Sequence, residues 1–147
     1  MPDLKIRIVN QSPNALPAYA TSGSSGMDLR AHLEQALALQ PLERSLVPTG
    51  LFIEIPEGYE AQVRPRSGLA IKNGLTCLNS PGTIDADYRG EIKVILINLS
   101  ATEQILNPGD RIAQLVFQKV ERAELISVTE LTTTARDQGG FGHTGHQ

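Results

Sequence analysis

The chain has 147 residues, 40% of them hydrophobic and 20% charged, which fits a single globular domain with one core. Its formal net charge of -3 argues against a protein that coats nucleic acid, although a small anion could still bind to a local patch. Cys77 is the single cysteine, which excludes an intramolecular disulfide and a cysteine zinc cluster. No apolar stretch reaches membrane-spanning length and the N-terminus lacks a signal-peptide core, so we expect a soluble, cytoplasmic protein without nucleic-acid or membrane partners.

Short segments in which apolar and polar residues alternate follow one another along the chain. Turn sequences such as "IPEG" and "NPGD" separate them, and the segments are residues 4–9, 51–55, 59–64, 91–99 and 111–120. In the last segment, Ile112, Gln114 and Val116 should share one face of a strand. Strands of this kind, separated by turn signals, predict an all-β sandwich or barrel.

Three segments do not follow this alternation. Residues 31–40 have helical propensity, but the segment is short and has no good stop signal, so its context favours a strand. Residues 67–74 predict a helix, with Ser67 as its N-cap and Gly74 at its C-terminal end. Residues 135–147 are rich in glycine and poor in apolar side chains, and composition alone predicts a mobile arm.

Several polar residues could belong to a site, and each also has a purely structural interpretation. Arg64 and Arg66 precede the predicted helix, whose N-terminal amides suit phosphate, and Ser67 could bond a phosphate oxygen instead of capping. Two solvated arginines beside an ordinary cap are the alternative. Asp28 taken alone is most simply a turn residue. Gln114 would either bond neighbouring backbone or face a site where strands meet.

The stretch Ile84–Tyr88 contains two aspartates after the turn "NSPG". In a regular strand Asp85 and Asp87 would share one face and Tyr88 the other. Alternatively, one aspartate pairs with Arg89 and the other ends a turn, and the residue types do not choose between these. The histidines are too scattered for a metal site, and we expect His143 and His146 to be exposed. "GFGHTG" fits a dinucleotide fingerprint but lacks the strand and the helix that such a site needs.

Five ordered segments together resemble the homotrimeric deoxyuridine triphosphatases (dUTP pyrophosphatases), a family with five motifs in this order. They run from Ser25 to Gly145 and read "SGMDLRA", "PRSGLA", "GTIDADYRGEI", "GDRIAQLVF" and "RDQGGFGHTG". Two positions depart from the family pattern. Met27 stands where an aromatic residue is usual, and Asp137 replaces the first glycine of R-G-x-G-G-F.

The resemblance implies an architecture. Residues 1–134 would form an all-β, jelly-roll-like distorted β-barrel with one short helix, and residues 135–147 a flexible C-terminal arm. In the family three subunits share each active site, and the arm of one closes the site of another. The sequence leaves open whether the arm of this chain reaches a neighbouring subunit or folds back on its own.

The resemblance also implies an activity, that of a dUTP diphosphatase. The enzyme would hydrolyse dUTP to dUMP and pyrophosphate by magnesium-assisted attack of water on the α-phosphorus, which keeps uracil out of DNA and supplies dUMP for dTTP synthesis. Asp85 would orient the water, and Gln114 would contact the phosphates or the water. Mg²⁺ would be held by substrate phosphates and waters, with no direct protein ligand. Asp28 would lie in the second shell of the metal or be structural.

Residues that bind substrate can be matched in the same way. Arg136 would reach the γ-phosphate, Tyr88 would pack beneath the deoxyribose and reject UTP, and Phe141 would stack over uracil. Asn79 and the backbone near Gly82 would read the uracil edge. The remaining matched positions are Arg66, Ser67, Gly68, Thr83, Ile84 and Gly142.

Two other functions are weighed against this one. A dCTP deaminase-like enzyme has a similar fold, but it expects a catalytic glutamate and different arginine-serine motifs. A regulatory module that binds dUTP with slow turnover belongs to a different class of protein. The presence of Asp85 and Arg136 counts against it.

Overall fold

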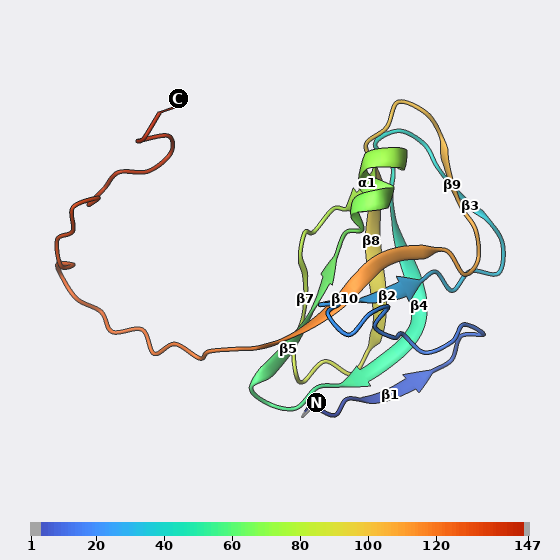
Figure 1. Cartoon of the computed structure of the whole chain (residues 1–147), viewed down its shortest axis with the longest axis horizontal. Coiled ribbons are helices and arrows are strands. Elements are labelled where there is room, and N and C mark those ends of the chain that lie inside the picture. The colour runs from blue at the N-terminus through green and yellow to red at the C-terminus, as the bar shows by residue number, and fades with distance from the viewer. Residues whose placement is uncertain (1–3, 146–147) are drawn as a thin grey trace.

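The structure is a computed structural model that describes residues 4–145. Within that range the chain forms ten short strands and one helix (Figure 1). In chain order these are β1 (Arg7–Asn10), β2 (Met27–Arg30), β3 (Leu37–Leu39), β4 (Arg44–Glu54), β5 (Tyr59–Arg64), α1 (Ser67–Asn73), β6 (Leu75–Cys77), β7 (Gly82–Ile84), β8 (Glu91–Asn98), β9 (Gln104–Leu106) and β10 (Arg111–Lys119). The predicted all-β class with one short helix is confirmed.

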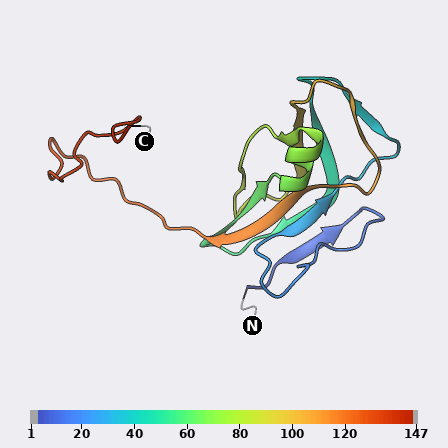
Figure 2. The ribbon, with the colours of Figure 1, turned by 45° about the horizontal axis from the view of Figure 1, so that its top comes forward.

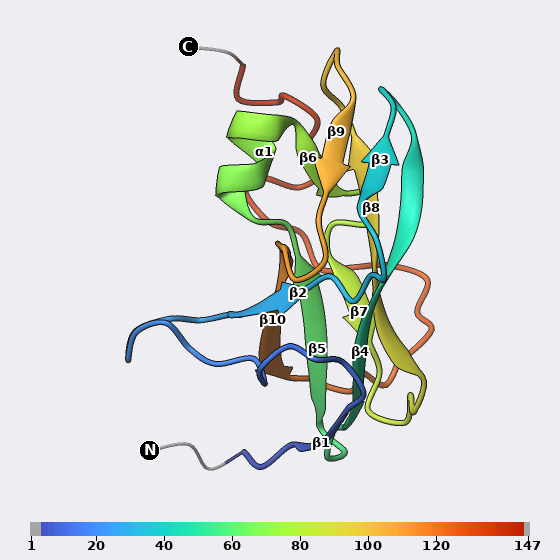
Figure 3. The same ribbon diagram turned by 90° about the vertical axis from the view of Figure 1, so that its right-hand side faces the viewer.

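The strands form two four-stranded antiparallel sheets and a small ribbon. One sheet has the order β1–β4–β8–β6, the other β2–β10–β5–β7, and β3 pairs with β9. Figure 3 shows the two layers side by side, with β4 and β8 in one and β5 and β10 in the other. Each sheet keeps its edge strands, so the expected barrel is a sandwich that is not closed within the chain.

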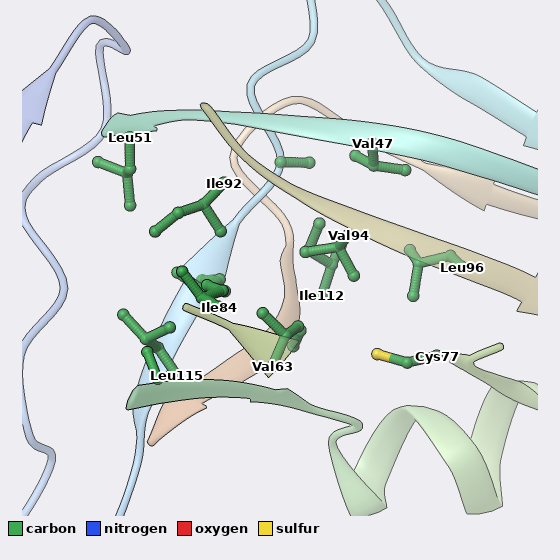
Figure 4. Packing of buried hydrophobic residues seen from close by; sticks show 14 of the residues in the cluster. Val47, Leu51, Val63, Cys77, Ile84, Ile92, Val94, Leu96, Ile112 and Leu115 are labelled. Atoms are coloured by element: carbon green, nitrogen blue, oxygen red, sulfur yellow. The ribbon is translucent and has the colours of Figure 1, made fainter. Parts of the chain in front are cut away.

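The core lies between these sheets and is almost entirely aliphatic. Val47, Ile92 and Val94 of one sheet face Val63 and Leu115 of the other (Figure 4). Alternate residues of β4, β5 and β8 point into this layer, as the period-two pattern predicts. Because each fully buried aliphatic side chain contributes about 1.5–3 kcal/mol, the layer is the main source of stability and a firm base for the loops.

The prediction for β10 is wrong at one residue. Ile112 does not share a face with Gln114 and Val116, since Ile112 belongs to the buried core whereas the other two line a surface pocket. The pairing of β10 with β2 shifts register between Arg111 and Ala113. A bulge of this kind inserts one residue and so changes which side chains point inward.

Residues 31–40 and 67–74, which did not follow the strand alternation, adopt different structures. Within residues 31–40, only Leu37–Leu39 is a strand, and residues 31–36 form neither helix nor strand. Helix α1 ends at Gly74 in the left-handed conformation, as predicted. Ser67 is not its N-cap, however: Arg66 occupies that position, without a capping side-chain hydrogen bond, and Ser67 is an exposed first residue of the helix.

After β10 the chain leaves the sheets. Residues 120–145 contain no helix or strand and are almost wholly exposed, and they extend away from both layers (Figures 1 and 2). His143 is exposed, as predicted, and His146 lies outside the described residues. The division into residues 1–134 and 135–147 stays a prediction. No helix in the described part of the chain is long and apolar enough to cross a membrane.

Candidate active site

The first group of predicted site residues is built around the Asp28 carboxylate. Asp28 lies within β2, so its interpretation as a turn residue is wrong. Its Oδ1 is 3.1 Å from Nε of Arg66, and its Oδ2 is 3.5 Å from a guanidinium nitrogen of Arg111. Such partly exposed pairs add at most about 1 kcal/mol of stability each. Their effect is to fix the direction of Arg66, whose guanidinium also donates to the Arg111 carbonyl at 3.3 Å.

Gln114 lies opposite Asp28 in the pairing of β10 with β2. Its Nε2 donates to the Pro65 carbonyl at 3.3 Å, which agrees with the expectation that the amide bonds neighbouring backbone. A Cβ on Gly26 would come within 2.9 Å of Gln114 Oε1. Gly26 therefore leaves the space that this amide occupies. Both residues line a pocket of about 330 Å³ together with Asp28.

The start of α1 stands beside this pocket. Arg64 lines the pocket, but its guanidinium donates to the side-chain oxygen of Gln62 at 2.9 and 3.1 Å. Ser67 is exposed and makes no capping bond. The first amides of any helix lack intrahelical partners, so Ser67 and Gly68 present donors of the kind that suit phosphate.

The second group of site residues follows β7. Asp85 comes directly after this strand, and its carbonyl accepts the Tyr88 amide at 3.1 Å. The chain therefore turns here, and Asp85 and Asp87 do not share the face of a regular strand. The alternative in which an aspartate pairs with Arg89 is not observed either. The Arg89 guanidinium lies 3.6 Å from Glu54 Oε1 and donates to the carbonyls of Ala86 and Tyr88.

Two pockets meet at Asp85. One, of about 430 Å³, is lined by Thr83, Ile84, Asp85 and Tyr88 together with side chains of β4 and β8. The other, of about 560 Å³, contains Asp85 but none of the other predicted site residues. We therefore take the smaller pocket as the candidate nucleoside site, since it gathers four of the predicted residues.

The turn before β7 brings Asn79 close to Gly82. A Cβ on Gly82 would lie 3.1 Å from Asn79 Nδ2, so these two predicted uracil contacts are neighbours. Ser80–Pro81 is a cis peptide bond within this turn, and "NSPG" is a turn as predicted. Gly26, Gly90 and Arg111 are not among the site residues that the sequence predicts. All three lie within the five matched motifs, which was the available signal for them.

The third group lies on the arm. Arg136 Nε donates to the Gly139 carbonyl at 2.6 Å, and the Gly139 amide donates back to the Arg136 carbonyl, which closes a tight turn. Asp137 has a positive φ of 47° within this turn. Phe141 is fully exposed. The segment that carries both residues extends away from the sheets (Figures 1 and 2), and neither residue lines a pocket of the other two groups.

In the described part of the chain, the donor side chains do not form a metal site by themselves. Within residues 4–145 no group of three or more histidine, cysteine, aspartate or glutamate side chains is arranged to hold an ion. Burial raises the pKa of Cys77 to about 11, so its thiol stays protonated at neutral pH and is no nucleophile.

Comparison with known proteins identifies the family. The sequence model of the dUTPase family matches residues 12–145, so the chain belongs to that family. It is 57% identical over 143 residues to the deoxyuridine 5'-triphosphate nucleotidohydrolase of Finegoldia magna, covering 97% of this chain and 100% of the relative. The enzyme of the same name from Cytophaga hutchinsonii is 61% identical over 140 residues, covering 95% and 91%.

Solved structures show the same fold. A mutant dUTPase of Staphylococcus bacteriophage 80alpha with dUpNHpp superposes with a TM-score of 0.87 at 24% identity, covering 97% of this chain and 99% of that one. A mutant of the dUTPase from phage phi11 of S. aureus, described with a structural Mg(II) ion, gives a TM-score of 0.78 at 24% identity, covering 88% and 99%.

Proposed function

We propose that this chain is a dUTP diphosphatase, which hydrolyses dUTP to dUMP and pyrophosphate and so keeps uracil out of DNA. The observation that carries the proposal is its identity of 57–61%, over nearly the whole chain, with deoxyuridine 5'-triphosphate nucleotidohydrolases. The five motifs of that family are present in order. As part of the proposal, the enzyme works in the cytoplasm.

Asp85 is the residue that we assign to the water. It is exposed at the edge of the candidate nucleoside pocket, and its backbone is fixed by the turn to Tyr88. A carboxylate is a weak base. It can still act by holding the water in line with the α-phosphorus, because phosphoryl transfer depends mainly on alignment and charge stabilisation.

The residues of the Gln114 pocket and of the start of α1 are compatible with a magnesium ion that is bound by the substrate phosphates. Both oxygens of Asp28 already lie beside arginines, so Asp28 is poorly placed to be a direct ligand, and a role near the metal waters stays a prediction. Mg²⁺ prefers phosphate oxygens and water, and it would lower the negative charge that repels an attacking oxygen. Arg66, Ser67, Gly68 and Gln114 would then orient the phosphate chain from the protein side.

We further propose that the active sites are shared in a homotrimer. Two observations support this. The pocket of Gln114 shares no lining residue with either pocket of Asp85. Arg136 and Phe141 lie on an arm that points away from both groups on the sheets. A complete site can therefore be assembled from one subunit's Gln114 pocket, a second subunit's Asp85 loop and a third subunit's arm, residues 135–147.

Uracil selection would depend on the turn before β7. Asn79 and the backbone of Gly82, Thr83 and Ile84 offer amide and carbonyl groups that can pair with the uracil edge. Cytosine would present a donor where the site expects an acceptor, and the resulting unpaired buried groups make such rejection strong. Phe141 and Gly142 of the arm would cover the opposite face of the base.

The experiment that tests the function is pyrophosphate release from dUTP, dCTP, dTTP and UTP, measured in parallel with and without magnesium. We expect release from dUTP alone, enhanced by magnesium. Ammonia released from dCTP would favour a deaminase instead. Binding of dUTP without release of pyrophosphate would favour the regulatory module.

A further inference from the structure

The side chain of Tyr88 lies back across its own loop. Its hydroxyl donates to the Glu91 carbonyl at 2.8 Å, which brings the ring over Gly90. An ideal Cβ built on Gly90 would lie 2.5 Å from Cζ and 2.8 Å from Cε1 of Tyr88, and closer still to the hydroxyl oxygen. Real Cβ atoms do not approach other heavy atoms within 3.0 Å, so any side chain at position 90 must displace the ring.

Backbone conformation does not explain the glycine at position 90. Within residues 4–145 the glycines with positive φ include Gly58 and Gly74, but not Gly90. At Gly58 the space for a Cβ is open and the left-handed backbone is the reason for glycine. At Gly90 the reverse holds, since its φ is not positive and the three nearest atoms that a Cβ would meet all belong to Tyr88.

The hydrogen bond to Glu91 also determines what Tyr88 presents to a ligand. The phenol proton is already donated to backbone, and 45% of the residue remains exposed beside Asp85. The ring face is therefore the surface that a bound sugar meets. An apolar face offers no partner to a 2'-hydroxyl, and its position decides whether that hydroxyl has room.

We propose that Gly90 is a positioning residue that sets the choice between deoxyribose and ribose. Because Gly90 has no side chain, the Tyr88 ring can lie directly over the backbone of residue 90. In that position the ring leaves room for deoxyribose but not for the extra hydroxyl of ribose. This inference rests on the proposed function and names the residue behind its sugar selectivity. The loop is anchored at both ends, by the Asp85–Tyr88 turn and by the Tyr88–Glu91 bond.

The first test compares kcat/KM for dUTP and UTP in the unmodified chain, in Gly90→Ala and in Gly23→Ala. Gly23 is the matched control, because a Cβ there meets nothing within 4 Å and its φ is not positive. We expect Gly90→Ala to lower the dUTP:UTP ratio by about tenfold or more, the range that steric discrimination commonly spans. Gly23→Ala should leave the ratio unchanged. An unchanged ratio in Gly90→Ala would overturn the inference.

A second test separates positioning from a general structural effect. In a Tyr88→Ala background no ring remains to be displaced, so adding Gly90→Ala should change the ratio no further. Effects of the two substitutions that simply add would contradict the inference, because residues that act through one another are not additive. A chain that does not hydrolyse dUTP at all would refute the proposed function. Hydrolysis with full selectivity in Gly90→Ala would refute only the role of Gly90.

Discussion

Arg66 and Arg136 are both predicted to bind phosphate, and they are held in opposite ways. Arg66 is fixed by Asp28 and by the Arg111 carbonyl, and only 23% of its side chain is exposed. Arg136 bonds a carbonyl of its own turn, on a segment that extends away from both sheets (Figures 1 and 2). Arg66 is oriented before any ligand arrives, whereas ordering the arm costs conformational entropy on binding.

The difference divides the site into a preorganised part and a closing part. Changes on the sheets should alter the chemical step directly, because those groups already stand in place. Changes on the arm should act through the binding and ordering of the closed state, and they should leave the fold untouched. The four predictions that follow test this division, from the largest expected effect to the smallest.

Asp85→Asn removes the charge that we assign to orienting the water and keeps the shape of the side chain. We expect kcat to fall by about 10²–10⁴-fold, the usual contribution of a positioned acid or base. Affinity for a non-hydrolysable dUTP analogue should stay close to that of the unmodified chain, since Asp85 is not a predicted phosphate contact. Turnover that survives this substitution would move the catalytic role to another residue.

Deletion of the residues after Arg136 removes the closing part alone. We expect kcat/KM for dUTP to fall by about 100-fold, because a site that cannot close aligns its reactants poorly. The melting temperature should not change, since residues 120–145 have no helix or strand and lie outside the core. A large fall in the melting temperature would show that the arm stabilises the fold, which contradicts the division into a preorganised part and a closing part.

Gly26→Ala disturbs the preorganised part without touching a charge. The new Cβ would meet Gln114 Oε1 at 2.9 Å and Val116 Cγ2 at 3.2 Å. We expect kcat to fall by about tenfold as the amide shifts, and overpacking to cost about 1–3 kcal/mol of stability. Gly23→Ala in the same loop is the control. Full activity in Gly26→Ala would show that the position of Gln114 does not matter for the reaction.

Asp137→Gly should have the smallest effect, and in the favourable direction. Asp137 has a φ of 47°, a conformation that costs a residue with a side chain about 1 kcal/mol relative to glycine. Its carboxylate also stands next to the arginine assigned to the γ-phosphate. We expect the substitution to tighten substrate binding by about fivefold, measured in steady-state kinetics. An unchanged or weaker apparent affinity would be the contrary result.

The sequence predicted β1, β5, β8, β10 and the second half of β4, because burial between two sheets imposes a period of two on most of these segments. It did not predict β2, β6, β7 or β9, which have only three or four residues each and are too short to show a period. It failed where a local irregularity overrides that period. The bulge before Ala113 turns Ile112 into the core, and nothing in the residue types marks it. At α1, Arg66 rather than Ser67 holds the N-cap position, because the helix already includes Ser67 as its first residue.

Without the family resemblance, the residue patterns could not group the site residues, for a different reason. Asp28 and Gln114 are far apart in the chain and become neighbours only through the register of β2 with β10. The turn at Asp85 and the resting place of the Tyr88 ring depend on hydrogen bonds to backbone groups, which residue types do not encode singly. The resemblance to the family identified the candidate residues, and the fold shows which of them are neighbours in space.

The central claim is that a site needs Asp85 and the arm from different subunits. Two differently tagged chains, Asp85→Asn and the chain cut after Arg136, can be co-expressed, purified through both tags and assayed for pyrophosphate release from dUTP. In every trimer that carries both tags, one of the three sites combines an intact Asp85 with an intact arm, so the pyrophosphate release should be well above the sum of that of the two parents. No gain over the parents would mean that one chain supplies both, which contradicts the shared site.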